Sequence, residues 1–193
     1  MKVAIIGKGR VGKAIGEGLE RTGHQVRYGH RVPSERPALA ADWGEMAVLA
    51  VPYHQVENVV ANIGHLLDDK IVIDVTNRLG PNGEPVPCGD ISGAERLQEM
   101  LPLAKVVKAF NTVFAQNQGT GRIGDERLTA FVAGDDAEAK TMVMSMMGSM
   151  GFDPVDSGPL RHAQYLEAMG LLMIKLAFEQ GMGPSIGYRL VRK

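Results

Sequence analysis

The sequence predicts an α/β fold in which a doubly wound, mainly parallel sheet is followed by an apolar C-terminal helix. Three observations predict it. Short runs of β-branched and small apolar residues alternate along the chain with segments of helical periodicity. Several of these runs lack polar alternation, which is typical of strands buried on both faces. The first run leads directly into a glycine-rich turn and a helical segment, the beginning of a parallel βαβ unit.

Length and composition restrict the classes of protein that the chain can belong to. Its 193 residues suit one domain, which we expect to comprise a layered sandwich over 1–160 and a C-terminal helix and tail over 161–193. A net charge of −1 excludes a strong general attraction to nucleic acid. The single cysteine, Cys88, excludes an internal disulfide framework and suits the cytoplasm. Every apolar run is shorter than the about 20 residues that a membrane span needs, so no membrane crossing is expected.

The strands are expected where continuous apolar runs end at glycine, proline or polar residues. Val3–Ile6 ends at a glycine, and the third run ends at Pro52. The expected strands are 3–6, 25–29, 46–51, 70–75, 105–110 and 129–133, with a short last strand at 154–155.

Helical periodicity fills most of the intervals between these runs. Val11, Ile15 and Leu19 recur at helical spacing, and Ser92 with Glu95 has the spacing of a capping box. The expected helices are 11–23, a weak one at 38–41, 56–67, one that begins after Ser92, 135–150 and 162–180. The segment 80–89, rich in glycine and proline, is expected to be an irregular loop.

The glycine-rich turn after the first strand carries the fingerprint of a dinucleotide-binding, Rossmann-type fold. It reads Gly7-Lys8-Gly9-Arg10-Val11-Gly12. The first glycine permits a tight turn, the second lets the backbone approach a pyrophosphate, and the third lets helix and strand pack closely. The free N–H groups at the start of the helix favour phosphate. The sequence therefore predicts dinucleotide binding by these six residues.

The residues after the second strand favour NADP over NAD. An NAD site usually has Asp or Glu there, on the ribose 2′-hydroxyl. Here the chain reads His30-Arg31, with Ser34 and Arg36 further on. Arg31 can offer a fork of donors to a 2′-phosphate, and Ser34 and Arg36 can add a hydroxyl and a second cation. His30 either lies beside the adenine or points to water.

Small and neutral polar residues follow the next strands, at the edge of the sheet where such folds bind ligands. They suit a nicotinamide ring with its ribose and amide. The expected contacts are Ala50, Val51, Pro52, Val75, Thr76, Asn77, Ala109, Asn111 and Thr112.

No acid–base pair, catalytic triad or metal-ligand spacing is evident, so we expect no metal site. Asn111 and His54 are weak catalytic candidates, and for His54 a surface position is the favoured interpretation. Hydride transfer between two organic redox groups needs little acid–base help from a protein. This rim therefore favours a cofactor-to-cofactor reductase over a carbonyl dehydrogenase.

The whole chain resembles the coenzyme F420-dependent NADP oxidoreductase family. The matching stretches are Val3–Gly12, Gly29–Arg31, Ala50–Pro52, Asp74–Thr76, Val106–Thr112 and Gly151–Leu160. The resemblance implies a compact Rossmann protein that passes hydride between NADPH and a deazaflavin, with NADP contacts from Gly7 to Gly12 and from Arg31. His30 replaces the small hydroxylated residue that the family usually has. The same module recurs in flavin-using metalloreductases, so FMN or FAD is an alternative acceptor.

The C-terminal helix is apolar nearly all round, which is typical of a helix buried on more than one side. We therefore expect a homodimer formed through it, and the helix can also wall the second-substrate pocket. β-Hydroxyacid dehydrogenases share the glycine fingerprint and carry a catalytic lysine that Lys175 loosely matches. Phe178 and Glu179 stand where that family has Asn or Asp, so a solvent-exposed lysine is the favoured interpretation.

Two other functions stay open on the sequence alone. A non-catalytic NADP-binding redox sensor would explain the lack of an evident acid or base. Reduction of a small imine or carbonyl compound would need a proton donor such as His54 or Lys175. The identity of the electron acceptor and the direction of the reaction are not determined by the sequence.

Overall fold

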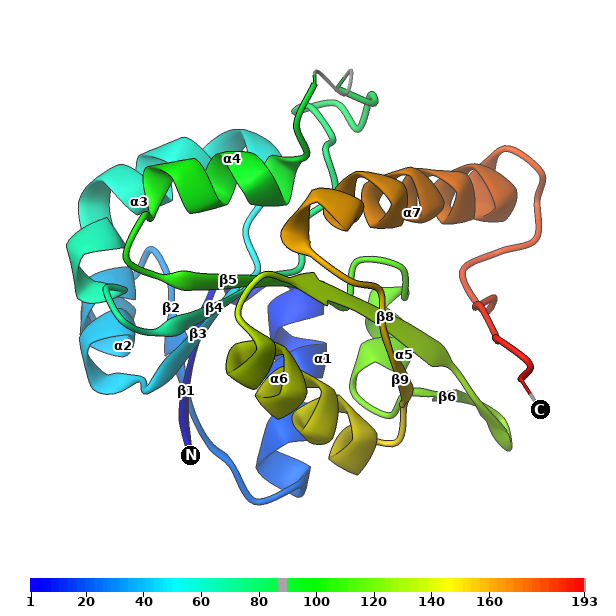
Figure 1. Cartoon of the computed structure of the whole chain (residues 1–193), viewed down its shortest axis with the longest axis horizontal. Coiled ribbons are helices and arrows are strands. Elements are labelled where there is room, and N and C mark those ends of the chain that lie inside the picture. The colour runs from blue at the N-terminus through cyan, green and yellow to red at the C-terminus, as the bar shows by residue number, and fades with distance from the viewer. Residues whose placement is uncertain (87–89, 193) are drawn as a thin grey trace.

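A seven-stranded sheet forms the centre of the molecule, with strand order β2-β1-β3-β4-β5-β8-β9 (Figure 1). The computed structural model describes residues 1–86 and 90–192, so the expectations for Cys88 lie outside the described residues. The sheet strands are β1 (Lys2–Ile6), β2 (Gln25–Gly29), β3 (Met46–Leu49), β4 (Ile71–Asp74), β5 (Lys105–Lys108), β8 (Thr129–Gly134) and β9 (Asp153–Asp156). Neighbouring strands are parallel, except that β8 is antiparallel to β5. The predicted doubly wound, mainly parallel sheet is confirmed.

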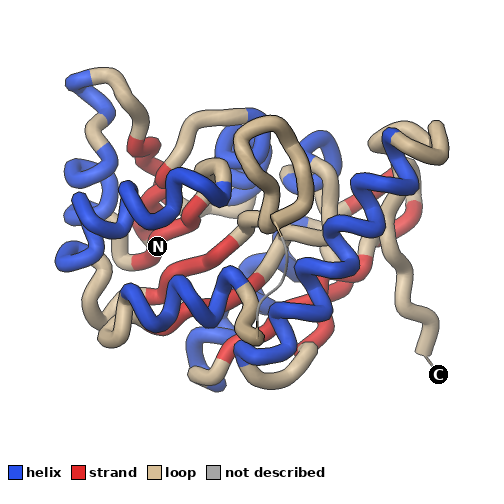
Figure 2. The backbone as a smooth tube through the Cα atoms, turned by 90° about the horizontal axis from the view of Figure 1, so that it is seen from above, coloured by secondary structure: helices blue, strands red, loops and turns tan. Residues whose placement is uncertain are grey.

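Helices cover both faces of the sheet, so the apolar strands are buried on each side (Figure 1). One layer holds α1 (Arg10–Arg21), the short α5 (Ala115–Gln118) and α6 (Ala137–Met150). The other layer holds α2 (Pro37–Trp43), α3 (Val56–Ile63), α4 (Gly93–Met100) and α7 (Ala163–Phe178). Figure 2 shows α7 running diagonally above the strands, beside α4. Among the described residues, no helix is both long and apolar enough to cross a bilayer.

The start of α4 follows the predicted capping box. Ser92 Oγ accepts a hydrogen bond from Glu95 N at 3.1 Å, and the Glu95 carboxylate accepts one from Ser92 N at 2.8 Å. Two donors that a helix otherwise leaves unsatisfied are therefore paired locally. α1 differs, because its first residue follows Gly9 and no side chain caps it.

Two predicted strands end two residues earlier than expected, and the residues that leave the sheet form its carboxyl edge. β3 ends at Leu49 rather than at 51, and β5 ends at Lys108 rather than at 110. Phe110 has a φ of 63°, a left-handed conformation that is rare for a bulky residue. Its ring is 1% exposed and packs edge-on against Phe152 with centroids 5.7 Å apart, which holds this conformation in place.

The sequence did not predict the shortest elements of the fold. The hairpin of β6 (Arg122–Ile123) and β7 (Glu126–Arg127) has two-residue strands, too short to show a period. α5 has only four residues. The predicted helix over 56–67 is divided, because α3 ends at Ile63 and a 3₁₀ turn, Gly64–Leu66, follows.

The C-terminal tail returns from α7 to the sheet. Thr129 in β8 donates its N–H to Tyr188 O at 2.9 Å, and its hydroxyl accepts from Leu190 N at 2.8 Å. The Tyr188 hydroxyl donates to Met169 O in α7 at 3.1 Å. The tail therefore links α7 to β8 through hydrogen bonds to both elements.

Candidate functional site

The glycine-rich turn between β1 and α1 has the shape that a dinucleotide diphosphate requires. Gly7 has a φ of 113°, and a Cβ added there would lie 2.2 Å from Ala50 O. A Cβ added at Gly12 would lie 2.0 Å from Gly7 O, so strand and helix pack too closely for alanine. A Cβ added at Gly9 would meet nothing within 4 Å, and Gly9 is exposed. The turn is closed at its ends and open in its middle, which fits an approaching phosphate.

The start of α1 leaves its electrostatic field free for an anion. No side chain caps the helix, and its first turn contains no acidic residue. The N–H groups of the first turn therefore remain available as hydrogen-bond donors, and no side chain neutralises the partial positive charge at this end of the helix. Together with the open middle of the turn, this fits the diphosphate of NADP.

The loop after β2 brings a carboxylate to the glycine-rich turn, which the sequence reasoning missed. Arg31, Ser34 and Arg36 are exposed, and Arg31 donates to Gln55 Oε1 at 3.4 Å. Glu35 forms an ion pair with Lys8 of the turn. The residues at the end of β2, Tyr28 to Arg31, contain no carboxylate, but Glu35 in the loop beyond them reaches the glycine-rich turn. The pairing with Lys8 offsets the negative charge of Glu35, so a 2′-phosphate facing Arg31 remains compatible with the loop.

The carboxyl ends of β4 and β5 are joined by two asparagines. Asn77 donates to Asn111 O at 2.9 Å, and Asn111 Nδ2 donates to Asn77 Oδ1 at 2.9 Å and to Leu166 O in α7 at 2.7 Å. Asn111, the catalytic candidate, thus already has a positioning function, because its amide connects the strand ends to α7. Its Oδ1 atom is buried without a hydrogen-bond donor among the described residues.

Helix α7 approaches this edge closely because it carries a glycine at the contact. A Cβ added at Gly170 would lie 2.3 Å from Asn77 Oδ1 and 3.0 Å from Asn111 O. A cavity of about 270 Å³ remains between the strand ends, α1, α5 and α7. Its lining consists of Arg10, Val11, Val75, Asn77, Asn111, Thr112, Val113, Phe114, Ala115, Gln118, Gly170, Met173 and Ile174.

The other residues expected to contact the cofactor lie at different depths. Pro52 is exposed and Ala50 and Val51 are half-buried, so this strand end is open to a ligand. Val75 and Thr112 are buried but line the cavity. Ala109 and Thr76 are buried as well, and neither lines this cavity. The cavity brings together six of the expected residues, which are Arg10, Val11, Val75, Asn77, Asn111 and Thr112.

Behind this edge lies a buried charge cluster that the sequence reasoning did not find. Lys108 Nζ contacts Asp74 Oδ2 at 2.9 Å, Thr76 O at 2.6 Å and Glu167 Oε1 at 3.1 Å. The side chains of Lys108, Asp74 and Glu167 are 0%, 2% and 1% exposed. All three ammonium donors are used, so the cation is fully satisfied. We call these three residues the buried triad.

The buried triad joins four elements of the fold. Asp74 ends β4 and Lys108 ends β5, and the two are register partners in the sheet. Glu167 lies in α7 and also accepts hydrogen bonds from Gly93 N and Ala94 N, the first residues of α4. The helix N-terminus favours a carboxylate at this position. The triad therefore helps to seat α7 over the strand ends.

The electrostatics of the buried triad keep Lys108 charged. Burial by itself lowers the pKa of an ammonium group, but the charges and hydrogen bonds of Asp74 and Glu167 outweigh it and raise the pKa of Lys108 above 10.5. The lysine is therefore a cation at neutral pH, and it stays apart from a reaction in the cavity because its three N–H donors are engaged and it does not line that cavity.

The two proposed proton donors lie on the surface. His54 is exposed, contacts Gln55 and lines a separate cavity of about 150 Å³ with Tyr53 and Arg96. Lys175 is half-exposed and pairs with Glu179 at 2.6 Å, one helical turn further on. The structure does not bring either residue into the lining of the cavity under α7.

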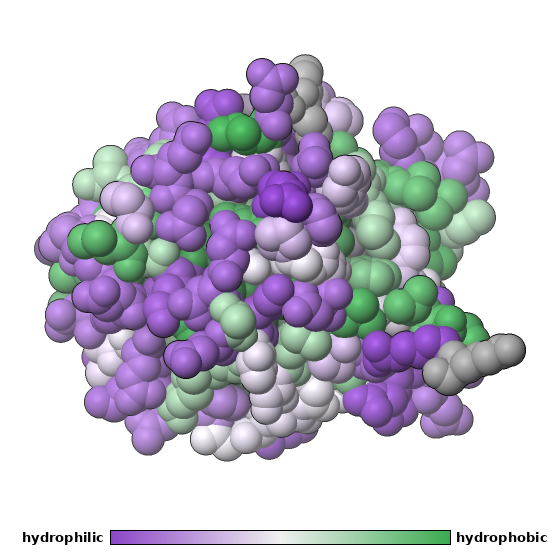
Figure 3. Space-filling view, viewed as in Figure 1, coloured by the Kyte–Doolittle hydropathy of each residue, from purple (hydrophilic) through white to green (hydrophobic). Residues whose placement is uncertain are grey.

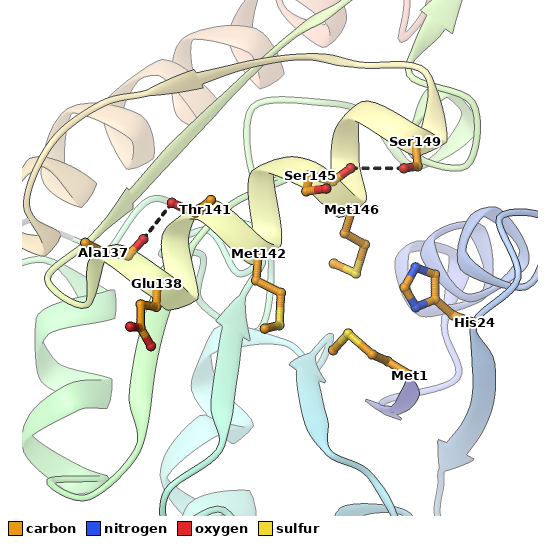
Figure 4. A pocket seen from close by; sticks show the side chains of 9 residues that line it. All are labelled: Met1, His24, Ala137, Glu138, Thr141, Met142, Ser145, Met146 and Ser149. Atoms are coloured by element: carbon orange, nitrogen blue, oxygen red, sulfur yellow. Dashed lines mark hydrogen bonds between the residues drawn. The ribbon is translucent and has the colours of Figure 1, made fainter.

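A wider groove lies at the opposite edge of the sheet, near the amino ends of β1 and β2 (Figure 4). Its volume is about 550 Å³, and Met1, Met142 and Met146 point into it beside His24. The hydroxyls of Thr141 and Ser149 donate to carbonyls of their own helix, as the dashed lines in Figure 4 mark. In doubly wound folds the ligand lies at the carboxyl ends of the strands, so this groove is not the dinucleotide site.

Comparisons with known proteins agree with this geometry. Residues 2–78 match the family model described as "NADP oxidoreductase coenzyme F420-dependent". The F420-dependent NADP reductase of Methanocaldococcus jannaschii is 29% identical over 144 residues, which cover 71% of this chain and 64% of that protein. The crystal structure of an Arthrobacter sp. FB24 protein, itself only provisionally assigned as an F420-dependent NADP reductase, matches with a TM-score of 0.89 and 28% identity. That match covers 100% of both chains.

A second group of relatives consists of metalloreductases. Metalloreductase STEAP3 of Rattus norvegicus is 30% identical over 186 residues, which cover 90% of this chain. The alignment spans 37% of the length of that relative, so this chain corresponds to only part of it. The relatives are therefore reductases whose named substrates differ, coenzyme F420 and NADP in one group and a metal in the other.

Proposed function

Because residues 2–78 match the coenzyme F420-dependent NADP oxidoreductase family, we propose that the chain transfers hydride between NADPH and a planar acceptor. The acceptor is a deazaflavin such as coenzyme F420, or a flavin. The observation that carries the proposal is the pairing of two features. An open glycine-rich turn for a diphosphate lies next to a cavity at the ends of β4 and β5, under α7.

Each part of the site has a function in this proposal. The backbone of Gly7–Gly12 holds the diphosphate, and Arg31 contacts the 2′-phosphate with Ser34 and Arg36 nearby. Pro52 and Asn111 border the nicotinamide, whereas Thr76 is buried and does not line the cavity. When bound, NADPH supplies the hydride from C4 of its nicotinamide ring. The chain itself contributes orientation, because it holds two planar rings together.

Helix α7 contributes the exclusion of water. Gly170 lets it lie against the asparagine pair, while Met173 and Ile174 present apolar side chains to the cavity. An apolar wall beside the reacting rings keeps water away from them and so limits competing reactions. The lack of an ionisable group other than Arg10 among the lining residues fits a transfer without acid–base catalysis.

The alternatives are less well supported. Reduction of a small imine or carbonyl compound requires a proton donor in the cavity, and His54 and Lys175 both lie elsewhere. A non-catalytic redox sensor needs no substrate cavity next to the dinucleotide. The metalloreductase relatives favour a metal ion as the final electron acceptor, as a variant of the same proposal in which a flavin passes the electrons on.

We also propose a homodimer that uses the outer face of α7. Tyr165, Leu172 and Phe178 are 59%, 49% and 66% exposed although they are large and apolar. Figure 3 shows apolar side chains gathered on the side of the molecule that carries α7 and the C-terminal tail. Burial of such a face between two copies would remove it from water.

Steady-state oxidation of NADPH tests the proposed reaction. The purified protein is incubated with coenzyme F420, FMN, FAD or no acceptor, and absorbance at the nicotinamide band is followed. We expect oxidation that depends on a deazaflavin or flavin, with the deazaflavin fastest. Tight binding of NADPH without oxidation by any acceptor would favour the sensor and contradict the proposal.

A further inference from the structure

Arg10 has a position that the dinucleotide alone does not explain. It is the first residue of α1 and is exposed, and its backbone belongs to the glycine-rich turn. Arg10 lines the cavity under α7 together with residues of α5 and α7, such as Ala115 and Gly170. Arg10 therefore belongs both to the glycine-rich turn of the diphosphate part and to the lining of the acceptor part of the site.

The guanidinium of Arg10 has no protein partner among the described residues. No hydrogen bond or ion pair of that part of the chain involves it. Neighbouring cations differ, because Lys8 pairs with Glu35 and Lys108 has two carboxylates. Arg10 is also the single charged residue in the cavity lining. An unpaired guanidinium at the edge of a neutral cavity is suited to an anionic group of a ligand.

A second observation indicates that the same cavity takes a polar ligand. Gln118 is 2% exposed, and its Nε2 donates to Phe110 O at 3.2 Å and to Val113 O at 3.0 Å. These bonds fix the orientation of the amide and leave Oε1 buried without a donor, as in Asn111. Two buried acceptors without donors therefore belong to residues that line one cavity. Buried polar atoms are normally satisfied, so a ligand with N–H groups is expected here.

We propose that the acceptor of the reaction carries an anionic side group, and that Arg10 binds this group while the heterocycle occupies the cavity under α7. This inference rests on the proposed function, since it assigns the chemical class of the acceptor. A phosphate or carboxylate on the side chain of a deazaflavin or flavin meets the requirement. A neutral heterocycle of the same shape binds more weakly, because the guanidinium then stays unpaired.

Two pairs of ligands that differ only in one phosphate test the inference. They are riboflavin with FMN, and 5-deazariboflavin with its 5′-phosphate. Their dissociation constants are measured by fluorescence quenching, with the protein saturated with NADP⁺. We expect the phosphorylated member of at least one pair to bind about tenfold or more tightly, as a charge-assisted contact provides. The preference should decrease as the salt concentration rises, because Arg10 is exposed.

Variants assign the preference to one side chain. Arg10→Ala is expected to bind both members of a pair equally, and Arg10→Lys to keep part of the preference. The control is Lys13→Ala, which removes an exposed cation of the same helix that does not line the cavity. A preference that persists in Arg10→Ala overturns the inference. Weaker NADP⁺ binding by Arg10→Ala with an unchanged phosphate preference also overturns it, since Arg10 would then bind the dinucleotide. If none of the four ligands binds to the wild-type protein, the inference is overturned as well.

The binding measurement separates this inference from the proposed reaction. A phosphate preference that depends on Arg10, without NADPH oxidation by any acceptor, would support the anion site and contradict hydride transfer. Oxidation of NADPH at equal efficiency with both members of each pair, bound equally well, would support hydride transfer and contradict the anion site.

Discussion

Lys108→Met is expected to destabilise the protein by about 3–5 kcal/mol, the usual effect of removing one partner from a buried ion pair. The variant leaves Asp74 and Glu167 buried without the cation that both of them contact. For a chain of this size the loss corresponds to a decrease in Tm of roughly 6–20 °C. Thermal unfolding followed by circular dichroism measures it. The matched control is Lys175→Met, which removes an exposed pair worth about 0.5 kcal/mol or less.

The stability difference between wild type and Lys108→Met is also expected to change with pH in a defined direction. The pKa of Lys108 is raised above 10.5 in the folded protein, so its contribution to stability is fully present below that pH and is lost only as the pH rises further. In Lys108→Met the two buried carboxylates repel each other, so one of them takes up a proton more readily than in the unfolded chain. The stability deficit of the variant should therefore shrink as the pH falls from 7 to 5. A variant as stable as wild type, or a deficit that grows with acid, contradicts this account of the triad.

Arg31→Ala is expected to weaken NADPH binding by about 10- to 100-fold and NADH binding by less than about twofold. A charge-assisted contact between guanidinium and phosphate is worth about 1.5–3 kcal/mol, and NADH lacks the phosphate. The exposed side chain has one partner, a 3.4 Å contact with Gln55, so little structure is lost with it. Dissociation constants of both nucleotides, measured by nicotinamide fluorescence, give the ratio directly.

A control variant separates a specific contact from a general effect of charge. Arg27→Ala removes a cation that lies over the Trp43 ring, 4.5 Å from its centroid, and precedes the end of β2. It should change neither dissociation constant by more than about twofold. Equal weakening of NADPH and NADH by Arg31→Ala would remove Arg31 from the 2′-phosphate. Since Glu35 lies at the same turn, the loop would then be better explained as a site in which this carboxylate binds the ribose 2′-hydroxyl of NAD.

The sequence predicted the parts of the molecule whose requirements are local. Gly7 and Gly12 are identifiable because the turn itself admits no side chain there, as the distances of 2.2 and 2.0 Å show. The Ser92–Glu95 capping box is equally local, with both of its hydrogen bonds formed within four residues. The parallel core strands followed from continuous apolar runs, which both helical layers bury.

The buried triad could not be predicted in the same way, because its members come from three distant segments. A signal was nevertheless present. Asp74 and Lys108 each close a buried apolar strand, and neighbouring parallel strands place such ends side by side. Glu167 lies between apolar neighbours, Leu166 and Ala168, in a largely apolar helix and needs a partner for that reason. A charged residue next to or inside an apolar run is thus the sequence feature that predicts a buried ion pair.

The path of the chain beyond β5 could not be predicted from the sequence either. Phe110 takes a positive φ because its ring packs against Phe152, 42 positions later in the chain, and no local pattern encodes that contact. The Lys8–Glu35 pair likewise depends on the fold of the loop after β2. Sequence reasoning placed the nucleotide loop correctly in the chain but could not tell which of its charges are neutralised.

Transfer of deuterium from NADPH to a deazaflavin tests the central claim most directly. NADPH labelled at one of the two C4 positions is oxidised by the protein with a 5-deazaflavin, and the reduced product is analysed by mass spectrometry. The bond formed at C5 of a deazaflavin is a stable C–H bond, so hydride passed directly between the rings stays in the product. The account predicts one deuterium in the product from one of the two labelled forms and none from the other. Unlabelled product from both forms would contradict direct hydride transfer at this site.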